Sequence, residues 1–200
     1  MKDFILDKCM NTIRSSKNFD EVKLSEIKYG LESLYLMFSK LIIISFISII
    51  LGIFKYMIIF ILLYNIVRMP SFGLHASKSW ICLVFSTLTF IGVPLLCQYL
   101  DINVVVKFSI GVFSIIGITL FSPADTKKRP IINRKRRLVY KILSFLISLI
   151  YFVLSFVIRN NYVQNCLLFS LIVQNVLISP LTYKLFNIPY NNYKSYVRRV

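Results

Sequence analysis

Acidic residues and histidine are the scarcest reactive groups in this chain. Of its 200 residues, 8 are Asp or Glu, against 24 Lys or Arg, and His75 is the single histidine. The four cysteines form no CxxC pair and no metal-ligand spacing with that histidine; they are Cys9, Cys82, Cys97 and Cys166. We therefore expect no metal site and no cofactor. Cys97 and Cys166 fall in or beside apolar stretches, so we interpret them as small buried apolar residues and expect no disulfide.

The sequence also lacks any sign of a nucleic-acid module. A net charge of +16 invites that interpretation, but no soluble basic domain or stacking aromatic motif accompanies it, so we do not expect nucleic acid as a partner. No cleavable apolar segment opens the chain, and we expect no signal peptide. What is abundant is apolar sequence: 57% of residues are hydrophobic, in long runs, which is typical of an integral membrane protein. One membrane domain, residues 1–200, is the simplest organisation.

The apolar runs predict an all-α polytopic bundle of six transmembrane helices. The expected spans are residues 34–51, 54–67, 80–97, 104–121, 142–158 and 162–179. Pro94 is expected to kink or end the third span and Pro180 to stop the last. A tight turn at 52–54 separates the first two spans; the alternative is one long tilted helix with a snorkelling Lys55, which leaves five spans.

The segment before the first span predicts an N-terminal amphipathic helix. Over residues 19–39, apolar side chains alternate with charged ones at helical spacing. Such a helix lies at the membrane surface or packs on the bundle from the cytosol.

Basic residues decide between five and six spans. Residues 122–141 carry one acid and eight basic residues: Lys127, Lys128, Arg129, Arg134, Lys135, Arg136, Arg137 and Lys141. A loop of this kind stays in the cytoplasm, and six spans then place both basic termini on the same side. Five spans would put the basic N-terminus outside. We therefore predict four cytoplasmic parts of a cell-membrane protein: the N-terminal segment 1–33, the bridge 68–79, the basic loop 122–141 and the tail 181–200.

His75 and Cys82 are the minimum equipment for nucleophilic acyl transfer, and this scheme places both at the cytoplasmic face. On one straight helix, seven positions separate them by roughly 10 Å along the axis. An acid–base pair needs about 3 Å, so a catalytic pair requires a break in the helix between them. The alternative is an inert thiol in an apolar helix and a solvated histidine at the membrane edge.

The sequence offers such a break. Pro70 and Gly73 disfavour helix before the histidine, and Ser77 or Ser79 can cap a helix after it. Cys82 then lies in the first helical turn, where free amides and the helix dipole favour a thiolate.

Asp125 lies in a second informative segment, Ser-Pro-Ala-Asp-Thr at 122–126. Its carboxylate is able to accept a hydrogen bond from His75 and to fix the imidazole tautomer. Capping of a turn, or pairing with a neighbouring Lys or Arg, is the alternative role.

Together these residues resemble a known family. The set is the mutual spacing of Arg68, Gly73, His75 and Cys82, followed by the 122–126 segment and a basic Lys-Lys-Arg-Pro. It is similar to the accessory gene regulator protein B family, AgrB, of Gram-positive quorum sensing, over most of the chain. One departure is Phe72, which stands where the family often has a second glycine beside the one matched by Gly73.

The resemblance implies a membrane cysteine endopeptidase that cuts the C-terminal tail from a short propeptide, AgrD, and helps to form a cyclic autoinducing peptide. It implies Cys82 as nucleophile and His75 as base, with Arg68 and Gly73 in supporting positions. It also implies a homodimer. A small peptide transporter or exporter without protease activity is the alternative function, and a structural subunit is a third.

The basic run after Asp125 has two possible roles. Precursors of this kind carry an acidic tail, and Lys127, Lys128 and Arg129 are candidates for holding it. Setting the orientation of the chain in the membrane is the other role, and the two are compatible.

Overall fold

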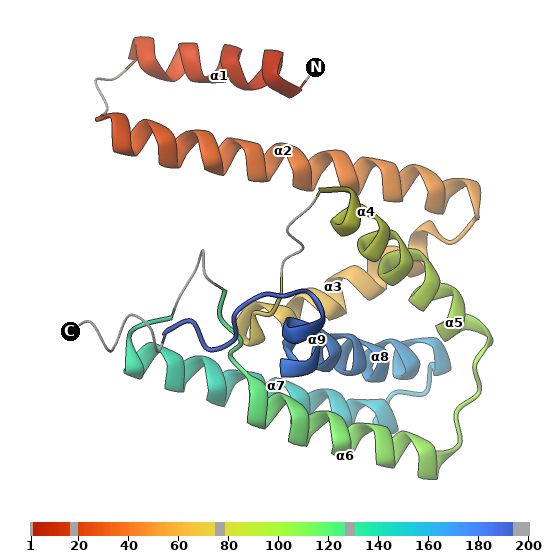
Figure 1. Cartoon of the computed structure of the whole chain (residues 1–200). Coiled ribbons are helices and arrows are strands. Elements are labelled where there is room, and N and C mark those ends of the chain that lie inside the picture. Colours follow the sequence, from red (N-terminus) through yellow and green to blue (C-terminus); the bar gives the residue numbers. More distant parts are fainter. Residues whose placement is uncertain (1, 17–19, 75–78, 127–130, 194–200) are drawn as a thin grey trace. The chain divides into compact units, whose positions relative to one another are not determined.

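The computed structural model describes residues 2–16, 20–74, 79–126 and 131–193. The chain divides into two compact units, Met1–Ile50 and Leu51–Val200, and each is described by itself. Figure 1 shows the helices of both.

The first unit is a pair of helices, α1 (Lys2–Ser16) and α2 (Glu21–Ile50). α1 packs against α2, and Leu6, Met10 and Leu24 are buried. Leu6 and Met10 are four residues apart, so they share one helix face. α2 joins the expected amphipathic segment and the first span into one 30-residue helix. The sequence prediction missed α1 because charged residues interrupt its short apolar groups, at 4–6 and 9–10, although apolar residues recur at helical spacing.

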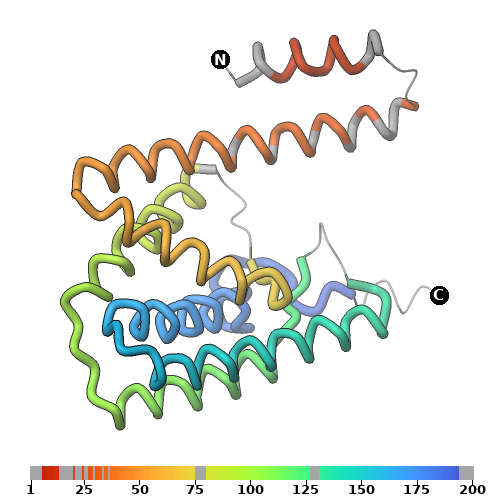
Figure 2. The backbone as a smooth tube through the Cα atoms, turned by 180° about the vertical axis from the view of Figure 1, so that it is seen from behind, coloured from red at the N-terminus to blue at the C-terminus, as the bar shows by residue number. Residues whose placement is uncertain are grey.

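The second unit is a bundle built around α8. Its elements are α3 (Phe54–Ser71), α4 (Ser79–Thr87), the π-helical turn η1 (Leu88–Gly92), α5 (Val93–Tyr99), α6 (Val104–Phe121), α7 (Arg134–Val157), α8 (Asn161–Ile178) and α9 (Pro180–Leu185). α8 packs against α3, α5, α6, α7 and α9, and Figure 2 shows it running between α3 and α7. Half of its span is buried, the largest share among the spans of the described chain. The core therefore lies along α8.

Six helices of the described chain are long and apolar enough to cross a membrane, which confirms the predicted all-α polytopic class. They are Gly30–Ile50, Phe54–Ser71, Trp80–Tyr99, Val104–Phe121, Arg134–Val157 and Asn161–Ile178. The break between the first two is a turn in which Gly52 has φ +69°, a conformation that glycine adopts without strain.

Pro94 does not end the third span. It lies at the start of α5, and the five residues before Val93 form η1, where the helix widens to a π turn. A proline has no N–H and crowds the carbonyl four residues earlier, and a wider turn relieves both problems. Pro180 does separate α8 from α9, as predicted, because it is the first residue of the new helix.

The start of α7 corrects the predicted basic loop. The helix begins at Arg134, eight residues before the expected span, because the Asn133 side chain caps it by accepting a hydrogen bond from the Arg136 amide at 3.1 Å. Arg and Lys are good helix formers, so the second half of the basic run extends the helix toward the interface.

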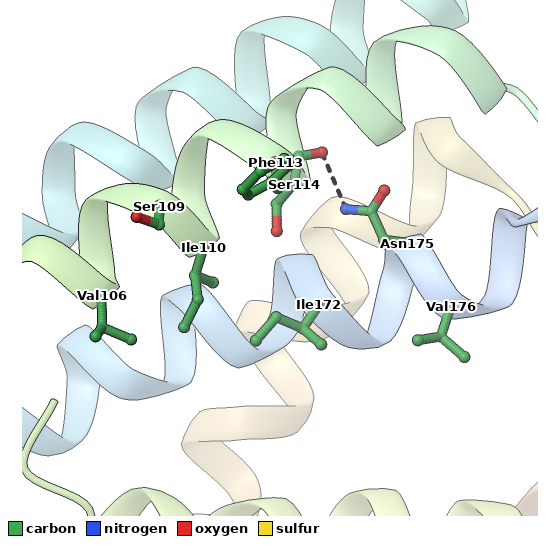
Figure 3. A pocket seen from close by; sticks show the side chains of 8 residues that line it. All are labelled: Val106, Ser109, Ile110, Phe113, Ser114, Ile172, Asn175 and Val176. Carbon is green, nitrogen blue, oxygen red and sulfur yellow. Dashed lines mark hydrogen bonds between the residues drawn. The ribbon is translucent and has the colours of Figure 1, made fainter.

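Polar side chains tie the other helices to the core of the second unit. Tyr151 of α7 donates to the Leu63 carbonyl at 2.8 Å, and Tyr162 of α8 to the Tyr56 carbonyl at 2.6 Å. Asn175 of α8 donates to the Ser114 carbonyl of α6 at 2.9 Å, which fixes the last turns of α8 against α6. Figure 3 shows this bond beside a shallow groove lined by Val106, Ser109, Ile110, Phe113, Ser114, Ile172, Asn175 and Val176.

Candidate active site

The helical course of the chain is interrupted just before His75, whereas the predicted break between His75 and Cys82 involves residues 75–78, which lie outside the described residues, and it stays a prediction. α3 ends at Ser71, and α4 begins at Ser79. Phe72 has φ +58° and ψ −133°, and Gly73 has φ +118°, so neither residue continues the helix. α3 runs through Pro70 before it ends, one turn further than we expected. Ser79 is the first helical residue of α4, so it is not the cap that the sequence suggested.

Residues 72–74 are held in place by main-chain hydrogen bonds on two sides. The Gly73 amide donates to the Ala124 carbonyl at 3.0 Å, and the Ala124 amide donates to the Ser71 carbonyl at 3.1 Å. On the other side, the Leu74 amide donates to the Leu177 carbonyl at the end of α8, at 3.1 Å. The chain is therefore fixed at the last residue before His75.

Gly73 is required by this arrangement. A Cβ atom built on it would lie 3.3 Å from the Leu177 carbonyl oxygen and 3.3 Å from Cγ2 of Ile178. Its φ of +118° is in a region that other residues rarely adopt. Phe72, at the position where the family pattern often has a second glycine, places its ring against Tyr140 of α7 with centroids 4.9 Å apart.

Arg68 of α3 holds the same segment through a hydrogen bond to the Leu74 carbonyl. Its Nη2 donates to the Leu74 carbonyl at 3.1 Å, and its Nη1 donates to the Tyr64 hydroxyl at 2.8 Å. With its amide on Leu177 and its carbonyl on Arg68, Leu74 has both backbone groups bonded. The guanidinium of Arg68 thus fixes the main chain of Leu74, the residue before His75.

Cys82 lies in the first turn of α4 as a free, partly exposed thiol. Cys97 and Cys166 are free and buried, as expected of small apolar residues, whereas Cys9 on α1 is exposed. Among the described cysteines, the accessible thiols are therefore Cys82 and Cys9. His75 and the three candidate tail-binding residues, Lys127, Lys128 and Arg129, lie outside the described residues.

Asp125 is buried, with 2% of its surface exposed, and both of its carboxylate oxygens accept main-chain hydrogen bonds. Oδ1 accepts from the Asn192 amide at 3.1 Å and Oδ2 from the Tyr193 amide at 2.8 Å. The carboxylate therefore holds the C-terminal part of the chain. Its predicted hydrogen bond to His75 stays a prediction.

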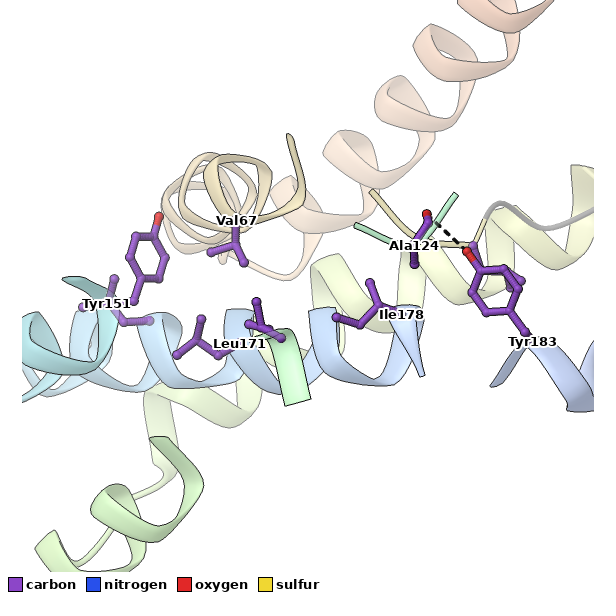
Figure 4. Close-up of a cluster of buried hydrophobic side chains, with 9 residues drawn as sticks. Val67, Ala124, Tyr151, Leu171, Ile178 and Tyr183 are labelled. Carbon is purple, nitrogen blue, oxygen red and sulfur yellow. Dashed lines mark hydrogen bonds between the residues drawn. The ribbon is translucent and has the colours of Figure 1, made fainter. Parts of the chain in front are cut away.

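Tyr183 of α9 completes the contact between the C-terminal part and residues 122–126. Its hydroxyl lies 3.4 Å from the Ala124 carbonyl oxygen and 3.2 Å from that of Asp125. Figure 4 shows it in one buried cluster with Val67, Ala124, Tyr151, Leu171 and Ile178. Burial, and then the nearby Asp125 carboxylate, raise the pKa of this phenol above its ordinary range.

Sequence reasoning missed two residues that support the site from within the spans. Gln174 of α8 is fully buried and donates to the Phe72 carbonyl at 2.8 Å. Ser144 of α7 meets the hydroxyls of Ser71 at 3.2 Å and Ser122 at 2.7 Å, and so joins the two segments on either side of the main-chain pairing. An available signal was their polarity, because polar residues within apolar spans usually face a partner inside the bundle.

Comparisons with known proteins identify the family of this chain. The family described as Accessory gene regulator B matches residues 6–178. The Accessory gene regulator protein B of Staphylococcus aureus (strain JH9) is 28% identical over 180 residues, covering 88% of this chain and 93% of that protein. A putative AgrB-like protein of Clostridium acetobutylicum is 27% identical over 205 residues, covering 100% and 97%. One from Listeria monocytogenes serotype 4a is 29% identical, covering 88% and 87%. No solved structure matches the chain. The chain belongs to the accessory gene regulator B (AgrB) family.

Proposed function

We propose that this protein is a membrane-embedded cysteine endopeptidase of quorum sensing, which cleaves the C-terminal tail of a short AgrD-like propeptide. Membership of the AgrB family supports a role in processing that peptide. The observation that carries the proposal is the end of α3 before His75, followed by a new helix that contains Cys82. Residues 72–74 are clamped by main-chain bonds just before His75, and a new helix starts so that Cys82 lies in its first turn.

In the first step, the Cys82 sulfur attacks the carbonyl carbon of the scissile peptide bond. A carbon–sulfur bond forms, the carbon–nitrogen bond breaks, and His75 delivers to the departing amine the proton it took from the thiol. The acidic tail leaves with its new amino terminus. The remaining peptide is an acyl-thioester on Cys82.

In the second step, a cysteine or serine side chain within the peptide attacks that thioester. Its sulfur or oxygen bonds to the carbonyl carbon, the bond to Cys82 breaks, and the proton returns through His75 to the Cys82 thiolate. The product is a thiolactone or lactone ring. Ring closure competes with hydrolysis, so the site must keep water out, and a position against the bilayer favours this.

Basic residues near this end of the bundle support a cytoplasmic location for the site. In the bundle of the second unit, residues 72–74, the segment 122–126 and the end of α8 meet at one end through the hydrogen bonds described above. The basic start of α7, Arg134 to Arg137, lies on the chain just after that segment, and basic residues accumulate on the cytoplasmic side. We place the site and both termini in the cytoplasm, where a newly made peptide arrives, and we expect a homodimer.

The test is co-expression with the short precursor, with mass spectrometry of the peptide products. Cys82→Ala and His75→Ala are expected to abolish cleavage, while Cys9→Ala, which removes the other accessible thiol, is expected to cleave normally. Cleavage at the normal rate in both Cys82→Ala and His75→Ala would overturn the proposal. Transport of the peptide into liposomes without cleavage would favour the exporter instead.

A further inference from the structure

The part of the chain after α9 folds back onto the candidate active site. We name residues 186–193 the C-terminal strap. Its course includes two residues with positive φ, Asn187 at +51° and Asn191 at +56°, which turn the chain twice. Asparagine tolerates this conformation better than most residues, so the turns are built into the sequence.

The strap is fastened at its far end to the segment that pairs with residues 72–74. The buried Asp125 carboxylate accepts the amides of Asn192 and Tyr193 at 3.1 and 2.8 Å. Arg137 lies over the Tyr193 ring, with its guanidinium carbon 3.6 Å from the centroid. Tyr190 directs its hydroxyl at the Phe121 carbonyl, 3.4 Å away. Hydrogen bonds to a buried carboxylate are among the stronger ones, so this end is well anchored.

The near end of the strap rests on the helix of the nucleophile. The ring of Phe186 packs edge-on against Phe85 of α4, with centroids 5.7 Å apart. Phe85 follows Cys82 by three residues, so the two project from neighbouring positions on one side of α4. The strap therefore contacts the helix of Cys82 through Phe186. Through Asp125 it also holds the 122–126 segment, in which the Ala124 carbonyl accepts the Gly73 amide just before His75.

We propose that the C-terminal strap sets the separation between residues 72–74, which lead into His75, and Cys82, with Asp125 and Phe186 as positioning residues at its two ends. This inference rests on the proposed function. It gives Asp125 a role that differs from the predicted contact with His75, because its carboxylate acts on the imidazole through the strap and the 122–126 segment.

The test compares three variants for cleavage of the precursor by the full-length protein in liposomes. Asp125→Asn keeps the shape of the side chain but turns an NH2 group toward one of the strap amides. Phe186→Ala removes the near-end contact. Phe108→Ala is the control for the loss of one ring contact, because Phe108 of α6 pairs edge-on with Phe152 of α7 at the same 5.7 Å. We expect kcat to fall about tenfold to hundredfold in the first two, with KM within about twofold, and no change in the control.

Alkylation separates positioning from loss of folding. In a Cys9→Ser background, iodoacetamide is expected to modify Cys82 alone, because Cys97 and Cys166 are buried. If the strap positions the pair, the pH profile of Cys82 alkylation in Asp125→Asn and Phe186→Ala approaches that of His75→Ala, while Cys97 and Cys166 stay unmodified. Loss of cleavage together with alkylation of Cys97 and Cys166 would mean that the variants had unfolded, and would overturn the proposal.

The two proposals fail in different ways. Cleavage that survives Cys82→Ala contradicts the endopeptidase. Cleavage that requires Cys82 but proceeds at the normal kcat in Asp125→Asn and Phe186→Ala overturns the strap alone.

Discussion

Replacing Gly73 with alanine tests whether the clamped segment before His75 is needed for activity. If the backbone stays in place, alanine must adopt φ +118° against the Leu177 carbonyl and Ile178, and strain of this kind costs about 1–3 kcal/mol. If residues 72–74 move instead, the bonds from Gly73 to Ala124 and from Leu74 to Leu177 are lost. Two net hydrogen bonds are worth about 1–3 kcal/mol together.

Both routes lead to the same magnitude. A cost of about 1–3 kcal/mol lowers the population of the native 72–74 conformation roughly 5- to 150-fold. Cleavage of the precursor per folded molecule is expected to fall by that factor, measured in liposomes alongside thermal unfolding in detergent.

Two other glycines serve as controls for this substitution. Gly52→Ala carries comparable strain, with φ +69°, but a Cβ there meets nothing within 4 Å, so it is expected to lose stability while cleaving normally. Gly30→Ala lies in the interior of α2 with open space around it and is expected to cleave normally and to gain about 0.5–1 kcal/mol of stability, because alanine favours a helix over glycine. If Gly73→Ala cleaves and unfolds like the wild-type protein, the clamp has no role in the reaction.

Two further substitutions test the supports of the site. Ser144→Ala leaves the buried Ser122 hydroxyl without its partner and is expected to destabilise the protein by about 1–3 kcal/mol in thermal unfolding. Ser148→Ala is expected to cost less, because its equally buried hydroxyl bonds only to the Phe145 carbonyl of its own helix. Tyr183→Phe is expected to reduce the loss of stability at alkaline pH. The pKa of Tyr183 is raised in the folded protein, so its stabilising contribution is complete below the ordinary value of 10.0 and is lost as the pH rises above it. Unfolding temperatures at about pH 8 and pH 11 measure the difference, and equal losses in both proteins would contradict the assignment.

The spans and the break before Cys82 follow from local chemistry that a sequence displays directly. Apolar runs of about 20 residues mark the membrane helices. Pro70 and Gly73 mark the end of α3. The helix nevertheless runs through Pro70 to Ser71, because a proline in the last turn removes only one hydrogen bond from the helix. α7 begins earlier than expected because Asn133 caps it, whereas the prediction considered only the charge of this run.

The contacts that hold the site were beyond prediction because they join segments far apart in the chain. The pairing of Gly73 with Ala124 and the bond from Gln174 to Phe72 depend on how α3, α6 and α8 pack. Asp125 was identified from its rarity, but its partners are main-chain amides of Asn192 and Tyr193, and every residue carries such an amide. No side-chain pattern in the sequence therefore indicates which main-chain amides will bond to the Asp125 carboxylate.

The π-helical turn η1 gives the third span two halves that are out of register. A wider turn of this kind amounts to one residue inserted into an α-helix, and one residue corresponds to about 100° of rotation and 1.5 Å of rise. α5 packs on α8, and η1 (Leu88–Gly92) lies between α5 and Cys82. The direction in which the Cys82 side chain points therefore depends on the rotation that η1 introduces. Deleting one residue there would make the helix regular and turn the Cys82 side of α4 about a quarter of the way around the axis. The length of this turn therefore sets the angle at which the thiol is presented.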